Sequence, residues 1–323
     1  MEQPKTLQRA IQHFSDEQIC IDTVAKMRWP NGPSCPACGH MQHYYLKTQK
    51  RWKCKECYKQ FTVKLGTIFE DSPIPLQKWL PALWMLVNCR NGVSSYEIAR
   101  DLGVSQKAGW FMLQRLRLAL QNNSFVKLGG PDSTPVEADE TFIGGKARNM
   151  HRSKRERMSR NGGMQGGSGK AVVMGMLQRG GKVRATVIPD RKHNITEQIV
   201  RELVEPGTEV HTDEFQGYYN LKDGYIHKIV NHLEGYVKEN VHTNGIENFW
   251  SLLKRGLGGT YVSVEPFHLF RYVDEQAFRF NNRKDENGRK LNDSDRFNLA
   301  LSQIAGKRLT FAEVTGKVGE AAF

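Results

Sequence analysis

Several features that would place a chain in a membrane or outside the cell are missing from this sequence. Its 323 residues contain no apolar run long enough to span a bilayer, so no membrane helix is expected. The N-terminal stretch MEQPKTLQRAIQHFSDEQ is polar and contains acids, so it is not expected to act as a secretory signal. Only six cysteines occur, and four of them form two close pairs. This usage favours a metal site in a reducing cytoplasm over a disulfide framework.

Acidic residues are too few to balance the basic ones. The chain has 47 Lys and Arg against 34 Asp and Glu, which gives a formal net charge of +13 and a pI near 9.5. Such an excess favours a polyanionic partner, and we expect that partner to be DNA. A ribosomal protein, or a basic soluble protein of another kind, would carry the same charge. The length predicts two domains, or three if one of them is small.

The first motif is a pair of Cys-x-x-Cys sequences, CPACG and CKECYKQF, separated by fifteen residues. Their cysteines are Cys35, Cys38, Cys54 and Cys57. Four thiolates at this spacing suit tetrahedral zinc, and short strands between the pairs predict a zinc ribbon. Because four cysteines leave no open coordination position, the zinc is expected to be structural.

A helix-turn-helix is predicted within residues 94–120, where Gly103 makes the turn and Ser105 caps the second helix. The second helix carries side chains that we expect to meet DNA: Gln106, Lys107, Gln114, Arg115 and Arg117. An αα-hairpin packed in a core would show the same pattern. The neighbouring ribbon and the basic charge favour DNA binding.

Composition places the main domain boundary in the Gly-, Pro- and Ser-containing stretch 122–134. We expect N-terminal helices and the ribbon over 1–70, the helix-turn-helix region over 71–130, a catalytic domain over 131–283 and a loosely attached tail over 284–323. Residues 146–169 form a basic insertion that includes Arg155. It is interpreted either as a solvated loop or as an arm that contacts DNA phosphates.

Acids cluster on the strand predicted at 135–141. Alternation puts Glu137 and Asp139 on one face, opposite Val136 and Ala138. Two acids on an inner strand are costly unless a cation pairs with them, whereas an edge strand would leave them solvated. Asp139 is our choice of metal ligand, and Glu137 and the adjacent Glu140 are its rivals.

Two more acids complete a candidate metal site. Asp213 ends a short predicted strand, and Glu247 lies beside the apolar stripe of a helix over 242–256, with Lys254 seven positions later. The element order predicts a mixed sheet flanked by helices. Carboxylates about 4 Å apart repel by roughly 4 kcal/mol at an effective dielectric of 20, so a cluster must protonate or hold cations. Oxygen ligands favour magnesium or manganese, and two such ions support phosphodiester chemistry.

The segments VEADETFIGG, HTDEFQGYY and HTNGIENFWSLLKRGLGGTY closely resemble the catalytic segments of DDE-type insertion-sequence transposases, in the subgroup with an N-terminal zinc ribbon. The resemblance runs from about residue 15 to about 285. It implies an RNase H-like catalytic domain in which Asp139, Asp213 and Glu247 are the catalytic acids and hold two magnesium or manganese ions. Lys254 matches the basic residue seven positions after the third acid, and we expect it and Arg255 to contact DNA.

The resemblance also implies an activity and a setting. The activity is metal-dependent cleavage of the element's ends and their joining to target DNA, by a homodimer or higher oligomer in the bacterial cytoplasm, associated with the nucleoid. Some relatives carry Asn as the third acid, and Asn248 follows Glu247; helical spacing favours Glu247, because Asn248 points about 100° further from the apolar stripe. Two alternatives are a DNA-binding regulator whose C-terminal domain dimerises, and a stand-alone nuclease of the same fold.

Overall fold

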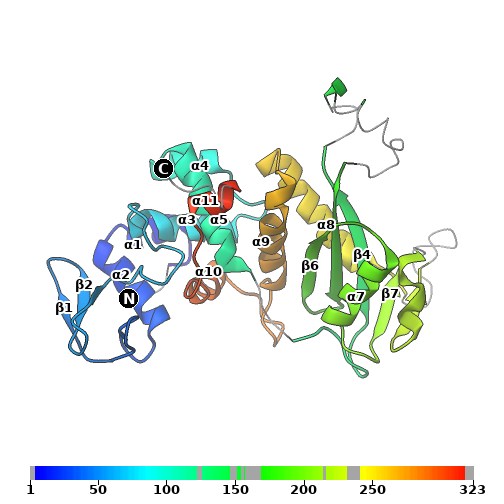
Figure 1. Cartoon of the computed structure of the whole chain (residues 1–323), viewed down its shortest axis with the longest axis horizontal. Helices are drawn as coiled ribbons and strands as arrows, with labels where there is room; N and C mark the ends of the chain where they lie inside the picture. The colour runs from blue at the N-terminus through cyan, green and yellow to red at the C-terminus, as the bar shows by residue number, and fades with distance from the viewer. Residues whose placement is uncertain are drawn as a thin grey trace. The chain divides into compact units, whose positions relative to one another are not determined.

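The computed structural model describes residues 4–121, 126–145, 151–153, 156, 169–213, 216–230 and 241–316. The chain forms two compact units, which are drawn in Figure 1. The first comprises Met1–Asn122 together with Asn282–Phe323, and the second comprises Asn123–Asn281. No helix in the described part of the chain is both long and apolar enough to cross a membrane.

The first unit begins with helices α1 (Leu7–His13) and α2 (Glu17–Arg28) and a small antiparallel sheet. The strands of this sheet are β1 (His43–Leu46), β2 (Arg51–Cys54) and β3 (Gln60–Phe61). Their register places Trp52 opposite both Tyr45 and Phe61, and the three rings pack on one face. The hydroxyl of Tyr45 donates to Gln18 Oε1 of α2 at 3.0 Å, which fixes that face on the helix.

Three helices follow the ribbon: α3 (Leu76–Asn88), α4 (Ser95–Leu102) and α5 (Gln106–Leu120). Helix α3 is the buried centre of the unit, with Trp79 and Trp84 each 1% exposed. Helix α4 ends at Gly103, whose φ of 59° lies in the left-handed region that glycine adopts without strain. The Ser105 hydroxyl accepts a hydrogen bond from the Ala108 amide and starts α5. The predicted turn between the two helices is therefore present.

The residues after Asn282 return to this first unit as α10 (Asp293–Ser302) and α11 (Phe311–Thr315). Phe297 is 1% exposed, and its ring centroid lies 5.3 Å from that of Phe14 and 5.4 Å from that of Trp84. The segment expected to be a loosely attached tail thus contributes to the core. Its helices are only ten and five residues long, so their periodic signal in the sequence is weak.

The second unit is built on a mixed five-stranded sheet in the order β6-β5-β4-β7-β8. The strands are β4 (Val136–Ile143), β5 (Ala171–Gln178), β6 (Val183–Ile188), β7 (Glu209–Thr212) and β8 (Ile226–Ile229). Strands β4, β5 and β6 pair antiparallel, whereas β7 runs parallel to both β4 and β8. This confirms the predicted mixed sheet and places the acid-bearing β4 at its centre.

Helices cover both faces of this sheet, as Figure 1 shows. One face packs against α7 (His193–Leu203) and the 3-10 segment η2 (Gln216–Lys222), and the other packs against α8 (Asn244–Gly256) and α9 (Leu269–Asn281). Two short segments, η3 (Leu257–Tyr261) and η4 (Pro266–His268), join α8 to α9. Because Ala138 belongs to the core beneath α7, its neighbours Glu137 and Asp139 face α8.

Only part of the basic insertion at 146–169 is described, namely residues 151–153, 156 and 169. Within it, exposed Arg152 donates to Glu156 Oε1 at 2.7 Å. Arg155, predicted to contact DNA, lies outside the described residues.

Candidate metal centre and candidate active site

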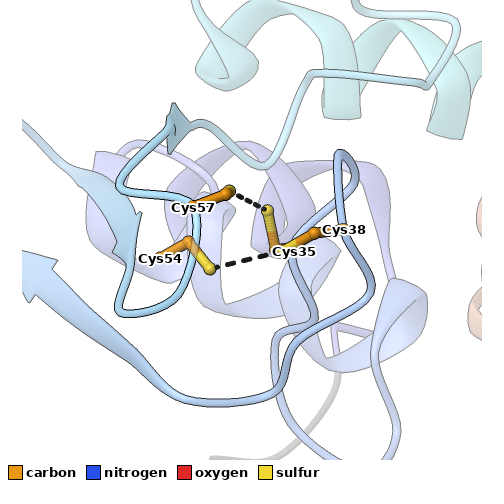
Figure 2. Close-up of side chains that lie close together, drawn as sticks. All are labelled: Cys35, Cys38, Cys54 and Cys57. Carbon is orange, nitrogen blue, oxygen red and sulfur yellow. Dashed lines mark hydrogen bonds between the residues drawn. The ribbon is translucent and has the colours of Figure 1, made fainter.

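Four cysteine sulfurs converge in the N-terminal ribbon, as Figure 2 shows. The Sγ atoms of Cys35 and Cys57 lie 3.6 Å apart, as do those of Cys38 and Cys54, and all four lie within 4.8 Å of one another. Tetrahedral zinc with Zn–S bonds of about 2.3 Å separates its sulfurs by about 3.8 Å. The four cysteines therefore fit a structural zinc ion, which would tie the two loops together.

The same backbone conformation turns both cysteine pairs inward. Gly39 follows the first pair with a φ of 75°, and Tyr58 follows the second with a φ of 56°. In each loop the amide of the leading cysteine donates to a carbonyl five positions on, at 2.9 Å for Cys35 and 3.0 Å for Cys54. The sequence predicted the first turn because glycine favours positive φ. It did not mark Tyr58, which adopts the same conformation without that advantage.

The electrostatic setting of Cys35 favours its thiolate. Burial raises the pKa of this thiol, but amide donors from Ala37 and Cys38 and the neighbouring thiols outweigh burial, and the pKa falls to about 7. For Cys38, an amide donor from His40 lowers the pKa, but burial and hydrogen bonds with the other three thiols outweigh it and raise the pKa to about 12. The cysteines thus share protons that zinc, which binds thiolates, would displace.

In the second unit, the acids of β4 lie in distinct environments, and the first of them is neutralised by protein groups. Glu137 is completely buried, and its Oε1 accepts from Arg179 Nε at 2.9 Å. Its Oε2 accepts from the amide of Ile246 at 2.9 Å, and His242 Nδ1 lies 3.2 Å from Oε1. A carboxylate bound this fully by the protein holds structure together and is a poor choice of metal ligand.

Glu140 points to the opposite face of the sheet, where it is also paired. Tyr218 donates its hydroxyl to Glu140 Oε1 at 2.5 Å, and Arg191 donates to Oε2 at 3.1 Å. Burial raises the pKa of Glu140, and the donors from Tyr218 and Arg191 oppose that rise. Glu140 therefore has its own cationic partner on the α7 side.

Asp139 differs from both neighbours. Within the described residues no lysine or arginine pairs with it, and its carboxylate Oδ2 accepts from the indole Nε1 of Trp250 at 2.9 Å. Burial, followed by the charges of Glu140 and Asp213, raises the pKa of Asp139 to about 7. A buried carboxylate repelled by other acids is a place where a cation binds favourably. Of the three rivals on β4, Asp139 is the one with this character.

The other two candidate acids approach the same region from different elements. Asp213 directly follows β7, which runs beside β4, and its charge acts on Asp139. Glu247 is exposed in the first turn of α8 and accepts from the Thr243 hydroxyl at 2.9 Å. Among described residues, only the four cysteines form a set of potential ligand atoms within 4.8 Å of one another. The three acids do not meet that closely in this structure.

The structure also bears on the choice between Glu247 and Asn248, which are both exposed. Trp250 reaches Asp139 from α8, and helix positions three apart lie on the same side. Glu247 precedes Trp250 by three positions, whereas Asn248 precedes it by two and points elsewhere. This geometry favours Glu247 as the third acid.

Lys254 and Arg255 are exposed in the last turn of α8. Lys254 stands seven residues after Glu247, which is about 10 Å further along the helix axis. A phosphate beside the acids is therefore within reach of a cation from the same helix.

Gln106 and Lys107 are exposed at the start of α5, as a DNA-contacting helix requires. Gln106 Nε2 donates to Ser95 Oγ at 2.9 Å, and Lys107 Nζ lies 4.7 Å from the ring centroid of Phe311. Both contacts are at the surface, so either side chain can exchange them for a phosphate or base.

Arg115 does not fit the predicted contact with DNA. It is 4% exposed, it donates to the carbonyl of Glu70 at 2.5 Å, and its guanidinium lies 5.7 Å from the ring of Trp79. Gln114 and Arg117 are buried as well. The later turns of α5 are enclosed by the unit, so their polar groups serve the core. The sequence pattern predicts the helix but not how much of it is covered.

Two contributions to the site were missed at the sequence level: the role of Arg179 and the hydrogen bond of Trp250. Trp250 lies on the apolar stripe of the helix predicted at 242–256, and it is 4% exposed. The sequence did offer one indication of this hydrogen bond. A buried indole N–H needs an acceptor, and an acid-bearing strand was already predicted.

Known proteins share both parts of this chain. A family model described as an ISXO2-like transposase domain matches residues 127–281, and one described as a transposase zinc-ribbon domain matches residues 15–60. An uncharacterized protein in transposable element ISH50 of Halobacterium salinarum is 31% identical over 260 residues, which cover 76% of this chain and 85% of the relative. An uncharacterized transposase-like protein of Haemophilus influenzae is 33% identical over 102 residues, which cover 31% of this chain and 82% of the relative.

Proposed function

We propose that this chain, which belongs to the family of ISXO2-like transposases, binds the ends of an insertion sequence, cleaves them and joins them to target DNA. The observation that carries the proposal is Asp139, a buried carboxylate at the centre of the sheet whose described surroundings include acids and no paired cation. Such a group favours a divalent ion, and divalent ions serve phosphodiester chemistry.

The strand order supports an RNase H-like catalytic domain. Three antiparallel strands, β6, β5 and β4, are followed across the sheet by β7 and β8, which run parallel to β4. In this arrangement the central strand carries one acid and the end of its parallel neighbour carries the next. Asp139 and Asp213 occupy those two places.

Asp139, Asp213 and Glu247 are the residues we assign to bind two magnesium or manganese ions. When bound, such ions activate the attacking oxygen and stabilise the leaving oxygen. The chain's own residues orient the ligands: Trp250 holds one oxygen of Asp139, and Thr243 holds one oxygen of Glu247. Release of Glu247 from Thr243 would free that carboxylate to turn toward Asp139.

We assign DNA binding to three surfaces. On the outer face of the ribbon, Tyr44 pairs across the strands with Lys53 and is 57% exposed, and Lys55 Nζ lies 4.9 Å from its ring. Lysines attract phosphates, and exposed rings stack on bases. The second surface is the helix pair α4–α5, as a helix-turn-helix with Gln106 and Lys107 at its start. The third is the end of α8 with Lys254 and Arg255, and a homodimer or higher oligomer would assemble on the bound ends.

The test uses a linear DNA carrying the element's end, with magnesium. Wild-type protein is expected to nick the end and join it to a second DNA. The single variants Asp139→Asn, Asp213→Asn and Glu247→Gln are expected to bind the end but to lose both reactions.

Each alternative has its own outcome. Cutting without joining by the wild type would indicate a stand-alone nuclease, and binding without cutting would indicate a regulator. If all three variants joined DNA as the wild type does, the assigned acids would be wrong.

A further inference from the structure

Helix α8, which carries Glu247, does not cap its own first turn. Thr243 occupies the N-cap position, but its side chain makes no capping hydrogen bond and donates instead to Glu247. The amide of Ile246 donates to Glu137 Oε2 at 2.9 Å, so the cap comes from β4, 109 residues earlier in the chain. A carboxylate at this end of a helix satisfies a free amide and complements the helix dipole.

The start of α8 packs closely on side chains of β4 and β5 at Gly245. A Cβ atom on Gly245 would lie 2.5 Å from Leu177 Cδ2 and 2.8 Å from Glu137 Oε2. The Glu137 carboxylate is itself held in place by Arg179 Nε at 2.9 Å. The position of this cap is therefore set by the sheet and not by the helix.

A second hydrogen bond joins the same strand to the next turn of the helix. Trp250 Nε1 donates to Asp139 Oδ2 at 2.9 Å. The indole lies directly on the sheet, because a Cβ on Gly175, the cross-strand partner of Asp139, would fall 2.6 Å from the ring.

The two hydrogen bonds between α8 and β4 have similar spacing on the strand and on the helix. Glu137 and Asp139 are two residues apart on a strand, which is about 6.7 Å. Ile246 and Trp250 are four residues apart on a helix, which is about 6 Å along its axis. A helix shifted along or rotated on the strand would lose both bonds. The pair therefore defines one register of α8 on β4.

We propose that Glu137 and Trp250 are positioning residues that lock α8 onto β4, so that Glu247 and Asp139 present their free oxygens to the same metal ions. This inference rests on the proposed function, because it assigns those ions to the acids. Glu137 fixes the turn that carries Glu247. Trp250 holds one oxygen of Asp139 and leaves the other for the ion.

The principal test compares two substitutions in the same core cluster. Trp250→Phe removes the indole N–H and keeps an aromatic ring, whereas Phe249→Leu removes aromatic packing beside it without deleting a hydrogen bond. Mn²⁺ binding is measured directly by electron paramagnetic resonance, and thermal unfolding is followed in parallel. We expect about 10-fold weaker Mn²⁺ binding for Trp250→Phe, as is typical when a partner of a metal ligand is lost. Phe249→Leu should lower the melting temperature and bind Mn²⁺ as the wild type does.

A second pair of variants keeps the proposal testable if Trp250→Phe does not fold. Glu137→Gln retains an oxygen that can accept from the Ile246 amide, whereas Glu137→Ala removes it. Mn²⁺ binding should be weaker for the alanine variant and largely recovered by the glutamine variant.

The outcomes separate this inference from the proposed function. If Asp139→Asn abolishes Mn²⁺ binding but Trp250→Phe and Glu137→Ala bind as the wild type does, the positioning role is refuted and the metal site stands. If the wild type binds no Mn²⁺, or Asp139→Asn binds it equally well, both proposals fail.

Discussion

The cysteine centre and the acid centre collect their ligands in opposite ways. The four cysteines lie between positions 35 and 57, on two loops of similar backbone conformation, and their sulfurs already stand within 4.8 Å of one another. The three acids span positions 139 to 247 and come from a strand, a strand end and a helix. Local spacing specifies the first centre, whereas the second exists only when β4, β7 and α8 are correctly packed. A structural site can thus be recognised from a motif, whereas the proposed catalytic site depends on the whole fold.

The two centres also affect stability in opposite directions. Four thiolates fill the coordination sphere of zinc, and binding of the ion is coupled to folding, so this centre supports the fold. In the acid centre, burial raises the pKa of Asp139, and the charges of Glu140 and Asp213 raise it further, so this carboxylate weakens the fold until a cation binds. Substitutions that alter one centre and spare the other test this contrast.

The largest effect is expected from breaking the cysteine centre. Cys54→Ser removes one of the four ligands, and structural zinc contributes about 10–16 kcal/mol to the folding of small zinc domains. The ribbon should therefore unfold, with loss of bound zinc measured by elemental analysis and loss of Trp52 burial measured by fluorescence.

Cys89→Ala is the matched control, since Cys89 lies outside the cluster. It should keep one zinc per chain. If the ribbon of Cys54→Ser were folded without bound metal, zinc would not be needed for the folding of this unit.

The next largest effect concerns Asp139 in metal-free protein. A carboxyl whose pKa is raised in the folded state binds more protons folded than unfolded, so stability declines as pH rises. The window runs from the ordinary pKa near 3.8 to about 7. The full shift corresponds to on the order of 4 kcal/mol. The free energy of unfolding should therefore fall between pH 4 and pH 7, as measured by urea denaturation.

Asp139→Asn should flatten that decline. Subtracting the variant's free energy of unfolding from that of the wild type at each pH cancels the contributions of other titrating groups. Added Mg²⁺ should restore stability to the wild type alone at pH 8. Parallel pH curves for the two proteins would show that the acid centre is not destabilising.

A smaller effect is expected at Gly175, where the indole of Trp250 lies on the sheet. Gly175→Ala places a Cβ 2.6 Å from that ring and forces α8 away from β5. Overpacking of this kind lowers the free energy of unfolding by about 1–3 kcal/mol. Gly258→Ala is the control, because a Cβ at that position would meet nothing within 4 Å, and it should change stability by less than about 0.5 kcal/mol. Equal values for the two variants would contradict the close packing of α8.

The same contrast explains how much could be predicted from the sequence. The cysteine ligands, the turn at Gly103 and the acid-bearing strand follow from local spacing and alternation, and the structure contains them. The place of that strand at the centre of the sheet, rather than at its edge, is known only from the structure. The local pattern gave no physical ground for choosing Asp139 over Glu137 and Glu140, because that ground lies in partners as distant as Arg179 and Arg191.

Errors arose where tertiary packing overrides local composition. The polar residue Arg115 looked available to DNA, but the surrounding helices bury it. The residues after 284 looked too polar to pack, yet Phe297 anchors them among aromatic rings of the first unit. In both cases the deciding contact comes from a residue far outside the short stretch of sequence that carries the pattern.

The smallest effect is expected for the salt dependence of DNA binding, and it distinguishes the exposed Lys254 from the buried Arg115. Lys254→Ala should weaken binding to the element's end and reduce the slope of log K against log salt by about one, because one phosphate contact is lost. Arg115→Ala should leave that slope unchanged and instead lower the melting temperature, because its guanidinium bonds the Glu70 carbonyl inside the protein. Both slopes can be measured by fluorescence anisotropy between about 50 and 200 mM salt. A reversal, with the slope changed by Arg115 and not by Lys254, would mean that DNA approaches α5 through a rearranged first unit and not the end of α8.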